Sequence, residues 1–377
     1  MNKNLFKLYI LRIIPHKFIR FTLKYLNVNY LLFGNSKKAV GTYIINDEKS
    51  YFSSFDESLD KEVLSGFEKC CDDYLQRNNL LREYILQCED CVIEPKHGWG
   101  IINSSNELIF DSISNNAWIE SYPPSFVKYI ISKSNATYYP ELISIRMLGG
   151  GEKNYWHFFS DLLGQIVLAQ KFNLDHIPFL ISKRLYDQAY YKQAVARSKY
   201  LQGLTWIVQD EQYIKTDTAY FMQKELNAVE QFLGIRVMLE VPNSDSKKRR
   251  KVFLTRNKNR IRHINNSFEI EEIAISYGFE IIDADTLNLN MQIELFGEIE
   301  FLIGIHGAGL TNIMFRKLAP MRLLEIFPKD YLQPHYYWLS KGIGHSYCCL
   351  MGSNTLKDTS FILNAEEFEK KLIRFIH

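Results

Sequence analysis

The loop that follows residue 305 combines small, basic and amide side chains in a pattern suited to binding phosphate. An apolar run at residues 300–305 precedes it and predicts a buried parallel strand, and residues 310–315 predict the first turns of a helix. Glycine at such a junction lets the backbone approach a ligand closely, and the first N–H groups of the helix are free to bind an anion. We therefore expect the loop to hold the diphosphate of a nucleotide. Its predicted ligand-binding residues are His306, Gly307, Ala308, Gly309, Leu310, Thr311 and Asn312.

Two other interpretations of this loop stay open. The residues from Gly307 to Asn312 form an incomplete G-x-G-x-x-G pattern, and Glu325 ends the next apolar strand, where dinucleotide-binding folds keep a carboxylate for the ribose. A nicotinamide-dependent oxidoreductase is therefore an alternative, although asparagine replaces the third glycine. A structural turn without a ligand would explain the glycines, but not the presence of His306 and Asn312 on one turn.

A second group of polar residues falls on one face of a predicted helix. Asn154, His157, Asp161 and Gln165 are three, four and four residues apart, with apolar side chains between them. A histidine and an aspartate one turn apart can share a proton, so either could act as a general base toward an attacking hydroxyl. The alternative is an ordinary solvated helix face, although such faces usually carry lysine and glutamate.

Two arginines follow the strand predicted at residues 252–255. Arg256 ends this strand, and Arg262 lies six residues further along the chain. A guanidinium group binds phosphate through paired hydrogen bonds and can neutralise a departing diphosphate. The alternative is a basic surface, because residues 247–262 include nine lysines and arginines. For Arg256 the strand end favours ligand binding, since ligands of parallel sheets bind there.

Two acidic patterns in the same region are better explained by capping. Asp283 and Asp285 imitate a D-x-D metal motif, but they follow a strand at a place where acidic residues cap turns. Asn266 and Glu269 have the spacing of a capping box at the start of a helix.

The chain resembles the family 61 glycosyltransferases in three blocks that occur in the expected order. The first is N-x-x-H-x-x-x-D from Asn154 to Asp161, and the last is GIHGAGLTNIMF with a following LLEIFP. The middle block consists of Phe253, Leu254, Thr255, Arg256, Arg262, Asn266 and Glu269. The resemblance covers about residues 142–350, and Ser267 stands where the family usually has glutamate.

The resemblance implies an inverting, metal-independent glycosyltransferase with no cofactor besides its nucleotide-sugar substrate. It places His157 and Asp161 at the reaction centre, and we expect Asn154 on the acceptor side. The donor is expected to bind through Arg256, Arg262, the loop from His306 to Asn312, and Glu325. Capsule, lipopolysaccharide or another surface glycan is the expected product, with a glycan or a lipid-linked oligosaccharide as acceptor. A non-catalytic partner in glycan assembly stays an alternative.

The order of predicted elements agrees with this interpretation. Strands and helices alternate from residue 141 onward, which predicts parallel sheets covered by helices. We expect an α/β protein of GT-B architecture, with two Rossmann-like domains facing a central cleft and a doubly wound parallel sheet in the C-terminal one. Expected helices include residues 59–86, 155–172, 184–200, 221–232 and 364–376. The expected divisions are a basic segment at 1–30, an acceptor-side domain at 31–241, a donor-binding domain at 242–355 and a C-terminal helix at 356–377.

Charge and composition set the expected location. Eight basic and no acidic residues precede Asp47, and those at positions 5–25 recur among apolar side chains, as in a helix lying on an anionic membrane surface. The alternative is a helix packed on its own domain. No run of eighteen apolar residues and no cleavable signal is evident. The sequence lacks the interleaved basic and aromatic residues typical of nucleic-acid binding, so we expect no nucleic-acid partner. We therefore expect a cytoplasmic protein, peripheral on the inner face of the membrane.

The cysteines fit a reducing compartment. Adjacent pairs are awkward to bridge, and a chain of 377 residues needs no disulfides for stability. A zinc site at Cys70, Cys71, Cys88 and Cys91 is a weak alternative, because a second C-x-x-C is missing.

Overall fold

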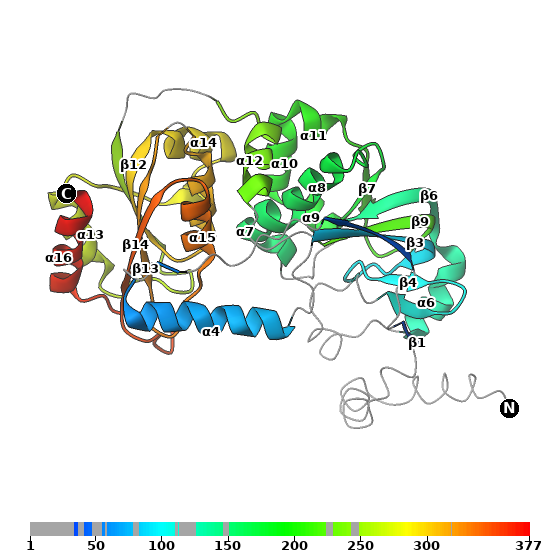
Figure 1. Cartoon of the computed structure of the whole chain (residues 1–377), viewed down its shortest axis with the longest axis horizontal. Coiled ribbons are helices and arrows are strands. Elements are labelled where there is room, and N and C mark those ends of the chain that lie inside the picture. Colours follow the sequence, from blue (N-terminus) through cyan, green and yellow to red (C-terminus); the bar gives the residue numbers. More distant parts are fainter. Residues whose placement is uncertain are drawn as a thin grey trace.

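The computed structural model describes residues 34–36, 41–46, 55–56, 59–77, 83–109, 112, 126–145, 151–223, 229–242, 249–317 and 319–377. The basic segment predicted to bind membrane and most of the polar linker predicted at residues 242–251 lie outside these ranges. The described residues form two α/β halves, each built on one sheet (Figure 1). None of the helices in the described ranges has the length and apolar character needed to cross a membrane.

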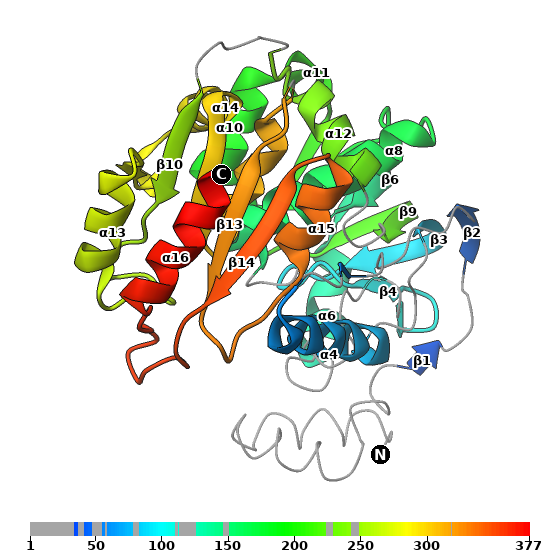
Figure 2. The same cartoon turned by 60° about the vertical axis from the view of Figure 1, so that its left-hand side comes forward.

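The C-terminal half contains a five-stranded sheet in which every neighbouring pair is parallel, as predicted (Figure 2). The strand order is β11-β10-β12-β13-β14. The strands are β10 (Arg250–Leu254), β11 (Glu280–Ile282), β12 (Ile299–Ile305), β13 (Arg322–Phe327) and β14 (Ser346–Met351). The helices of this half are α13 (Ser267–Ser276), the 3₁₀-helices η5 (Ala284–Thr286) and η6 (Ala308–Phe315), α14 (Leu289–Glu298), α15 (His335–Gly342) and α16 (Ala365–Ile376).

Apolar side chains on both faces of this sheet explain why helices cover both faces. Phe253 and Ile303 belong to the cluster that α13 and α16 complete on one face, whereas Val252 and Leu302 belong to the cluster on the other face, with α14 and η6. Successive residues of a strand point to opposite faces, so continuous apolar strands require cover on both. The doubly wound arrangement predicted for this half is confirmed.

The strand order also marks where a ligand would bind. Counted along the chain, the order is 2-1-3-4-5, so β10 has the strand that follows it on one side and β12 on the other. Ligands of open parallel sheets bind at such a switch point, beyond the carboxyl ends of the strands. Arg256 follows β10 and His306 follows β12, so both lie at this point.

The N-terminal half differs from the second Rossmann-like domain that was predicted, because its nine-stranded sheet is mixed. Strands β9, β6, β7 and β8 are parallel, whereas β3 is antiparallel to β9, β2 and β4. The strands are β1 (Gly34–Ser36), β2 (Gly41–Asn46), β3 (Glu83–Ile93), β4 (Gly100–Ile102), β5 (Glu107–Ile109), β6 (Thr137–Ser144), β7 (Phe179–Ser182), β8 (Trp206–Gln209) and β9 (Ile214–Gln223). The helices are α4 (Lys61–Arg77), α6 (Phe126–Ser132), α7 (Tyr155–His157), the π-helical turn η4 (Phe158–Leu163), α8 (Gly164–Lys171), α9 (Lys183–Tyr186), α10 (Ala189–Arg197), α11 (Lys199–Gly203) and α12 (Val229–Met238).

Three predicted helices needed correction. Residues 221–223 of the helix predicted at 221–232 belong to β9, whose threonines and aromatic residues favour a strand. Residues 83–86 of the helix predicted at 59–86 belong to β3. The helix predicted at 184–200 is divided, and the Ser198 hydroxyl accepts a hydrogen bond from the Leu201 N–H at the start of α11.

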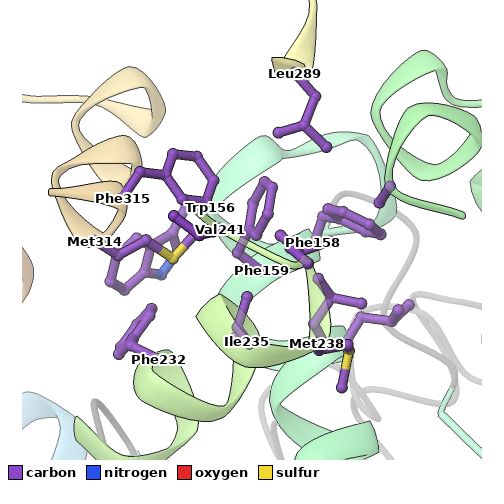
Figure 3. Close-up of a cluster of buried hydrophobic side chains, with 14 of the residues drawn as sticks. Trp156, Phe158, Phe159, Phe232, Ile235, Met238, Val241, Leu289, Met314 and Phe315 are labelled. Carbon is purple, nitrogen blue, oxygen red and sulfur yellow. The ribbon is translucent and has the colours of Figure 1, made fainter. Parts of the chain in front are cut away.

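The two halves share one core. Trp156 and Phe159 lie on the helix that carries His157 and Asp161. They pack with Phe232 of α12 and with Met314 and Phe315 of the C-terminal half (Figure 3). Because the aromatic side chains of both halves fill the same apolar cluster, the helix that carries His157 and the 3₁₀-helix that follows His306 are held against each other.

Helix α4 adds a second connection between the halves. It precedes β3 in the chain, yet Val63 and Phe67 pack against Phe327 of β13 and Tyr337 of α15 (Figure 1). The helix between β2 and β3, two strands of the N-terminal sheet, therefore packs against the C-terminal half.

Candidate active site

The glycine loop after β12 is pressed against an arginine. Nη1 of Arg256 donates a 2.9 Å hydrogen bond to the carbonyl oxygen of His306. A Cβ atom on Gly307 would lie only 2.5 Å from Nη2 of the same arginine, so glycine is required for this approach. Ala308 and Gly309, at the start of η6, are partly exposed. The loop therefore offers backbone N–H groups beside a guanidinium group, as phosphate binding requires.

His306 is buried and paired with Glu325. Its Nδ1 lies 2.6 Å from Oε1 of Glu325, and Oε2 of Glu325 accepts a 2.7 Å hydrogen bond from the Tyr347 hydroxyl. Burial lowers the pKa of His306 and raises the pKa of Glu325. Glu325 is wholly buried and both of its oxygens are engaged, which leaves none for a ribose. The geometry therefore directs Glu325 toward His306 and Tyr347, and its contact with the donor stays a prediction.

The other predicted residues of this loop point inward. The side chains of Leu310, Thr311 and Asn312 are buried. Nδ2 of Asn312 donates to Oε1 of Gln292 at 2.6 Å, and its Oδ1 accepts from the Tyr155 hydroxyl at 2.7 Å. In this structure these side chains hold the turn in place, and Asn312 ties η6 to both α14 and α7.

Arg256 and Arg262 bring two positive charges together without a matching carboxylate. Burial and the neighbouring Arg262 lower the pKa of Arg256 to about 10. The Arg262 guanidinium carbon lies 4.4 Å from the ring centroid of Tyr331, and its Nε and Nη1 are buried without a hydrogen-bond partner. Among the described residues no carboxylate forms an ion pair with either arginine. Buried charges are normally paired, so this arrangement calls for an anionic ligand.

The predicted histidine–aspartate pair is present on the first turns of the helix. Nδ1 of His157 lies 2.6 Å from Oδ2 of Asp161, and Oδ1 accepts a 2.8 Å hydrogen bond from the Ser160 hydroxyl. The His157 side chain is 40% exposed and that of Asp161 20% exposed. The pair lies where α7 passes into the π-helical turn, a feature that often marks functional sites. An exposed pair of this kind can exchange protons with a substrate.

The polar helix face predicted from Asn154 to Gln165 is shorter than expected, because neither of its end residues belongs to it. Oδ1 of Asn154 accepts a 2.9 Å hydrogen bond from the Trp156 N–H, so Asn154 caps the helix. Gln165 is buried. The π-helical turn adds a residue to the turn, which takes positions beyond Asp161 out of the α-helical spacing on which the prediction relied.

Aromatic residues connect the helix of His157 and Asp161 to the glycine loop that follows β12. The ring centroids of Trp156 and Tyr336 are 5.1 Å apart, and those of Tyr336 and His306 are 5.3 Å apart. Together with the bond between Tyr155 and Asn312, these contacts bring the histidine–aspartate helix beside the glycine loop. The sequence analysis did not single out these aromatic residues, although Tyr155 and Trp156 lie within the first resembling block and Tyr336 lies within a run of aromatic residues.

A comparison with protein families decides the class of this site. The model of glycosyltransferase family 61 matches residues 155–322, which include the histidine–aspartate pair, both arginines and the whole glycine loop. Residues 155–322 form a glycosyltransferase 61 domain. The presence of this domain implies a transferase enzyme and suggests sugar transfer. A comparison with curated proteins finds no match.

Helix α12 of the N-terminal half holds the end of η6 in the C-terminal half. Nε of Arg236 in α12 donates a hydrogen bond to the carbonyl oxygen of Met314. Its Nη2 donates a 2.8 Å hydrogen bond to the carbonyl oxygen of Arg316. These carbonyls close the end of η6, where a positive charge is favourable. Arg236 therefore fixes the far end of the 3₁₀-helix that begins at the glycine loop.

The capping interpretations are confirmed for one acidic pattern and corrected for the other. Oδ1 of Asp283 accepts a 3.0 Å hydrogen bond from the Asp285 N–H and so caps η5. Asn266 is the residue before α13, but its side chain bonds to Glu269 and to the backbone of Leu363 instead of capping the helix.

Cys71 of the alternative zinc site belongs to a different hydrophobic cluster from Cys88 and Cys91. Cys71 packs with α15 and β13, whereas Cys88 and Cys91 lie in the core of the N-terminal sheet. Among the described residues no group of His, Cys, Asp and Glu is placed to hold a metal ion.

Proposed function

We propose that the protein is an inverting glycosyltransferase that moves a sugar from a nucleotide-sugar donor to a hydroxyl of a glycan or a lipid-linked acceptor. The observation that carries the proposal is the pair of arginines without counter-ions, Arg256 and Arg262, at the switch point of the parallel sheet beside the loop of His306. A donor diphosphate would supply the missing negative charge and would bind at the strand ends where α/β proteins bind ligands.

In the proposed reaction, the histidine–aspartate pair acts on the acceptor and the two arginines act on the leaving group. The pair of His157 and Asp161 accepts the proton of the acceptor hydroxyl, whose oxygen forms a bond to the anomeric carbon. The bond between that carbon and the diphosphate oxygen breaks, and its electron pair leaves with the diphosphate. Arg256 and Arg262 stabilise the charge that develops on the leaving group, which is the role of a metal ion in other enzymes. Attack opposite the leaving group gives inversion.

The proposed biological setting rests on the family and on the basic N-terminal segment. Assembly of capsule, lipopolysaccharide or another surface polysaccharide at the cytoplasmic face of a membrane fits a glycosyltransferase with a basic N-terminal segment. Binding of the full-length protein to anionic lipid vesicles at low salt would support this location. Vesicles that fail to retain the protein would contradict it.

The test of the proposed function is a thermal-shift and calorimetric screen against uridine, guanosine, cytidine, adenosine and thymidine diphosphates and their sugar esters. Ligands that bind the folded state raise the melting temperature in proportion to affinity. We expect one nucleoside diphosphate to bind in the presence of EDTA and its sugar ester to be consumed with a hydroxyl acceptor. Binding without turnover by any acceptor would favour the non-catalytic partner, and selective binding of NAD would favour the oxidoreductase.

A further inference from the structure

The imidazole of His306 is held on several sides. Its ring centroid lies 5.0 Å from that of Phe327, 5.5 Å from that of Tyr331 and 5.3 Å from that of Tyr336. Nδ1 is engaged by Glu325, whereas Nε2 has no hydrogen-bond partner among the described residues. Because the ring is packed on its faces and bonded at Nδ1, Nε2 is the atom of His306 available to a ligand.

Tyr347 of β14 fixes the Glu325 carboxylate through a hydrogen bond. Its Oε1 faces Nδ1 of His306, and its Oε2 accepts the hydrogen bond of Tyr347 at 2.7 Å. The register of the parallel strands produces this arrangement, because β13 carries Glu325 between β12, which leads to His306, and β14, which carries Tyr347. The titratable and charged groups that face the pair are Arg256, Arg262, Tyr331, His335, Tyr336, Tyr347 and Cys349.

Resting on the proposed function, we infer that Tyr347 and Glu325 are positioning residues that keep a hydrogen atom on Nε2 of His306, so that His306 donates a hydrogen bond to an oxygen of the donor diphosphate. Neither Tyr347 nor a link from Tyr347 through Glu325 to His306 follows from the pattern of the sequence.

Proton counting explains why the pair favours this form. The electrically neutral pair carries one proton between Nδ1 and Oε1. Whether that proton is on the nitrogen or on the oxygen, Nε2 keeps its own hydrogen. If the pair loses a proton, Nδ1 must donate to the carboxylate, and Nε2 presents a lone pair that repels phosphate. Burial disfavours the charged pair and so maintains Nε2 as a donor.

The first test reads the tautomer directly, without any substrate. In ¹⁵N-histidine-labelled protein, the His306 signals are assigned by their loss in His306→Gln. We expect a hydrogen on Nε2 in the wild type and in Glu325→Gln, whose amide can donate to Nδ1 and accept from Tyr347. In Glu325→Leu we expect both tautomers. A wild type with hydrogen on Nδ1 alone and a bare Nε2 would overturn the inference.

The second test measures the affinity for the nucleoside diphosphate selected by the screen, by calorimetry at pH 7.5 with folding checked by circular dichroism. We expect Glu325→Gln to stay within about threefold of the wild type and Glu325→Leu to bind about tenfold more weakly, as for loss of one hydrogen bond to a charged group. Tyr347→Phe should lose about two- to tenfold in affinity.

Tyr337→Phe is the matched control for Tyr347→Phe. The Tyr337 ring lies 5.2 Å from that of Tyr347, but its hydroxyl accepts a hydrogen bond from the Asp56 N–H instead of donating one to Glu325. Equal affinities of the two variants for the nucleoside diphosphate would mean that Tyr347 does not help to position His306. If no nucleoside diphosphate binds although Nε2 carries its hydrogen, the proposed donor is wrong and the positioning of His306 stands.

Discussion

Two histidine–carboxylate pairs in this molecule have the same geometry and opposite surroundings. In each, Nδ1 of the histidine lies 2.6 Å from a carboxylate oxygen. The side chains of His157 and Asp161 are 40% and 20% exposed, whereas those of His306 and Glu325 are 6% and 0% exposed. Burial penalises charge separation and proton exchange, so the second pair suits a fixed hydrogen-bond donor and the first suits a base. Environment, more than residue type, separates the two roles.

Replacement of Asp161 by asparagine should have the largest effect on turnover. The amide keeps the shape of the side chain but cannot accept the proton of the acceptor, so turnover should fall roughly 10²–10⁴-fold, with little change in the affinity for the nucleoside diphosphate. Steady-state kinetics and calorimetry check both expectations. Normal turnover in this variant would place the base elsewhere and would break the comparison.

Removal of each histidine should separate the pairs by stability. His306→Ala leaves Glu325 buried and partnerless on one side, which should lower the free energy of unfolding by about 3–5 kcal/mol. His157→Ala removes an exposed pair and should lower it by less than about 1 kcal/mol. Urea denaturation of the two variants provides the measurement. Similar losses would mean that burial does not distinguish the pairs.

We expect the region around His306 and Glu325 to bind an anion because two arginines lie beside it. Arg256→Met removes the charge from the loop and should weaken nucleoside diphosphate binding about 10–100-fold, as expected for charge-assisted hydrogen bonds. Arg260→Met is the control, because Arg260 lies in the same segment but is exposed and paired with Asp285. Calorimetric titrations that show equal affinity for both variants would argue that the region acts through general positive charge.

The pH dependence of stability sharpens the account of the buried pair. His306, with its pKa lowered from 6.5, contributes stability that is lost as pH falls below about 6.5, whereas Glu325, with its pKa raised from 4.5, contributes stability that is lost as pH rises above about 4.5. Between these values the two changes offset each other. Above about pH 6.5 only the titration of Glu325 still changes the stability, so the free energy of unfolding should decrease by at most about 1.4 kcal/mol per pH unit.

Glu325→Gln provides the control for this prediction. Its amide does not titrate, so the decrease above pH 6.5 should disappear when unfolding is measured over the same pH series. An identical decrease in the variant would assign the pH dependence to other groups.

The sequence predicted the parts of the fold that depend on local pattern. The strands of the C-terminal sheet were found within a few residues, because continuous apolar runs between turn residues indicate buried parallel strands. The pair of His157 and Asp161 was found because helical spacing brings these side chains together. The switch-point position of Arg256 and His306 follows from the same alternation of elements.

The remainder depends on contacts between distant residues. Sequence alone treats His306 as a loop residue, but the neighbouring strands bury it with Glu325, nineteen positions away. The packing of α4 on the C-terminal sheet and the bond between Tyr155 and Asn312 join segments that no local pattern connects. The π-helical turn after His157 also lacks a distinctive composition.

A crystal structure of the protein with its nucleoside diphosphate tests the central claim most directly. The account predicts phosphate oxygens within hydrogen-bond distance of the Arg256 guanidinium group and of Nε2 of His306, with the pair of His157 and Asp161 making no contact with phosphate. A diphosphate bound to His157, or bound away from the glycine loop, would contradict the assignment of the two pairs.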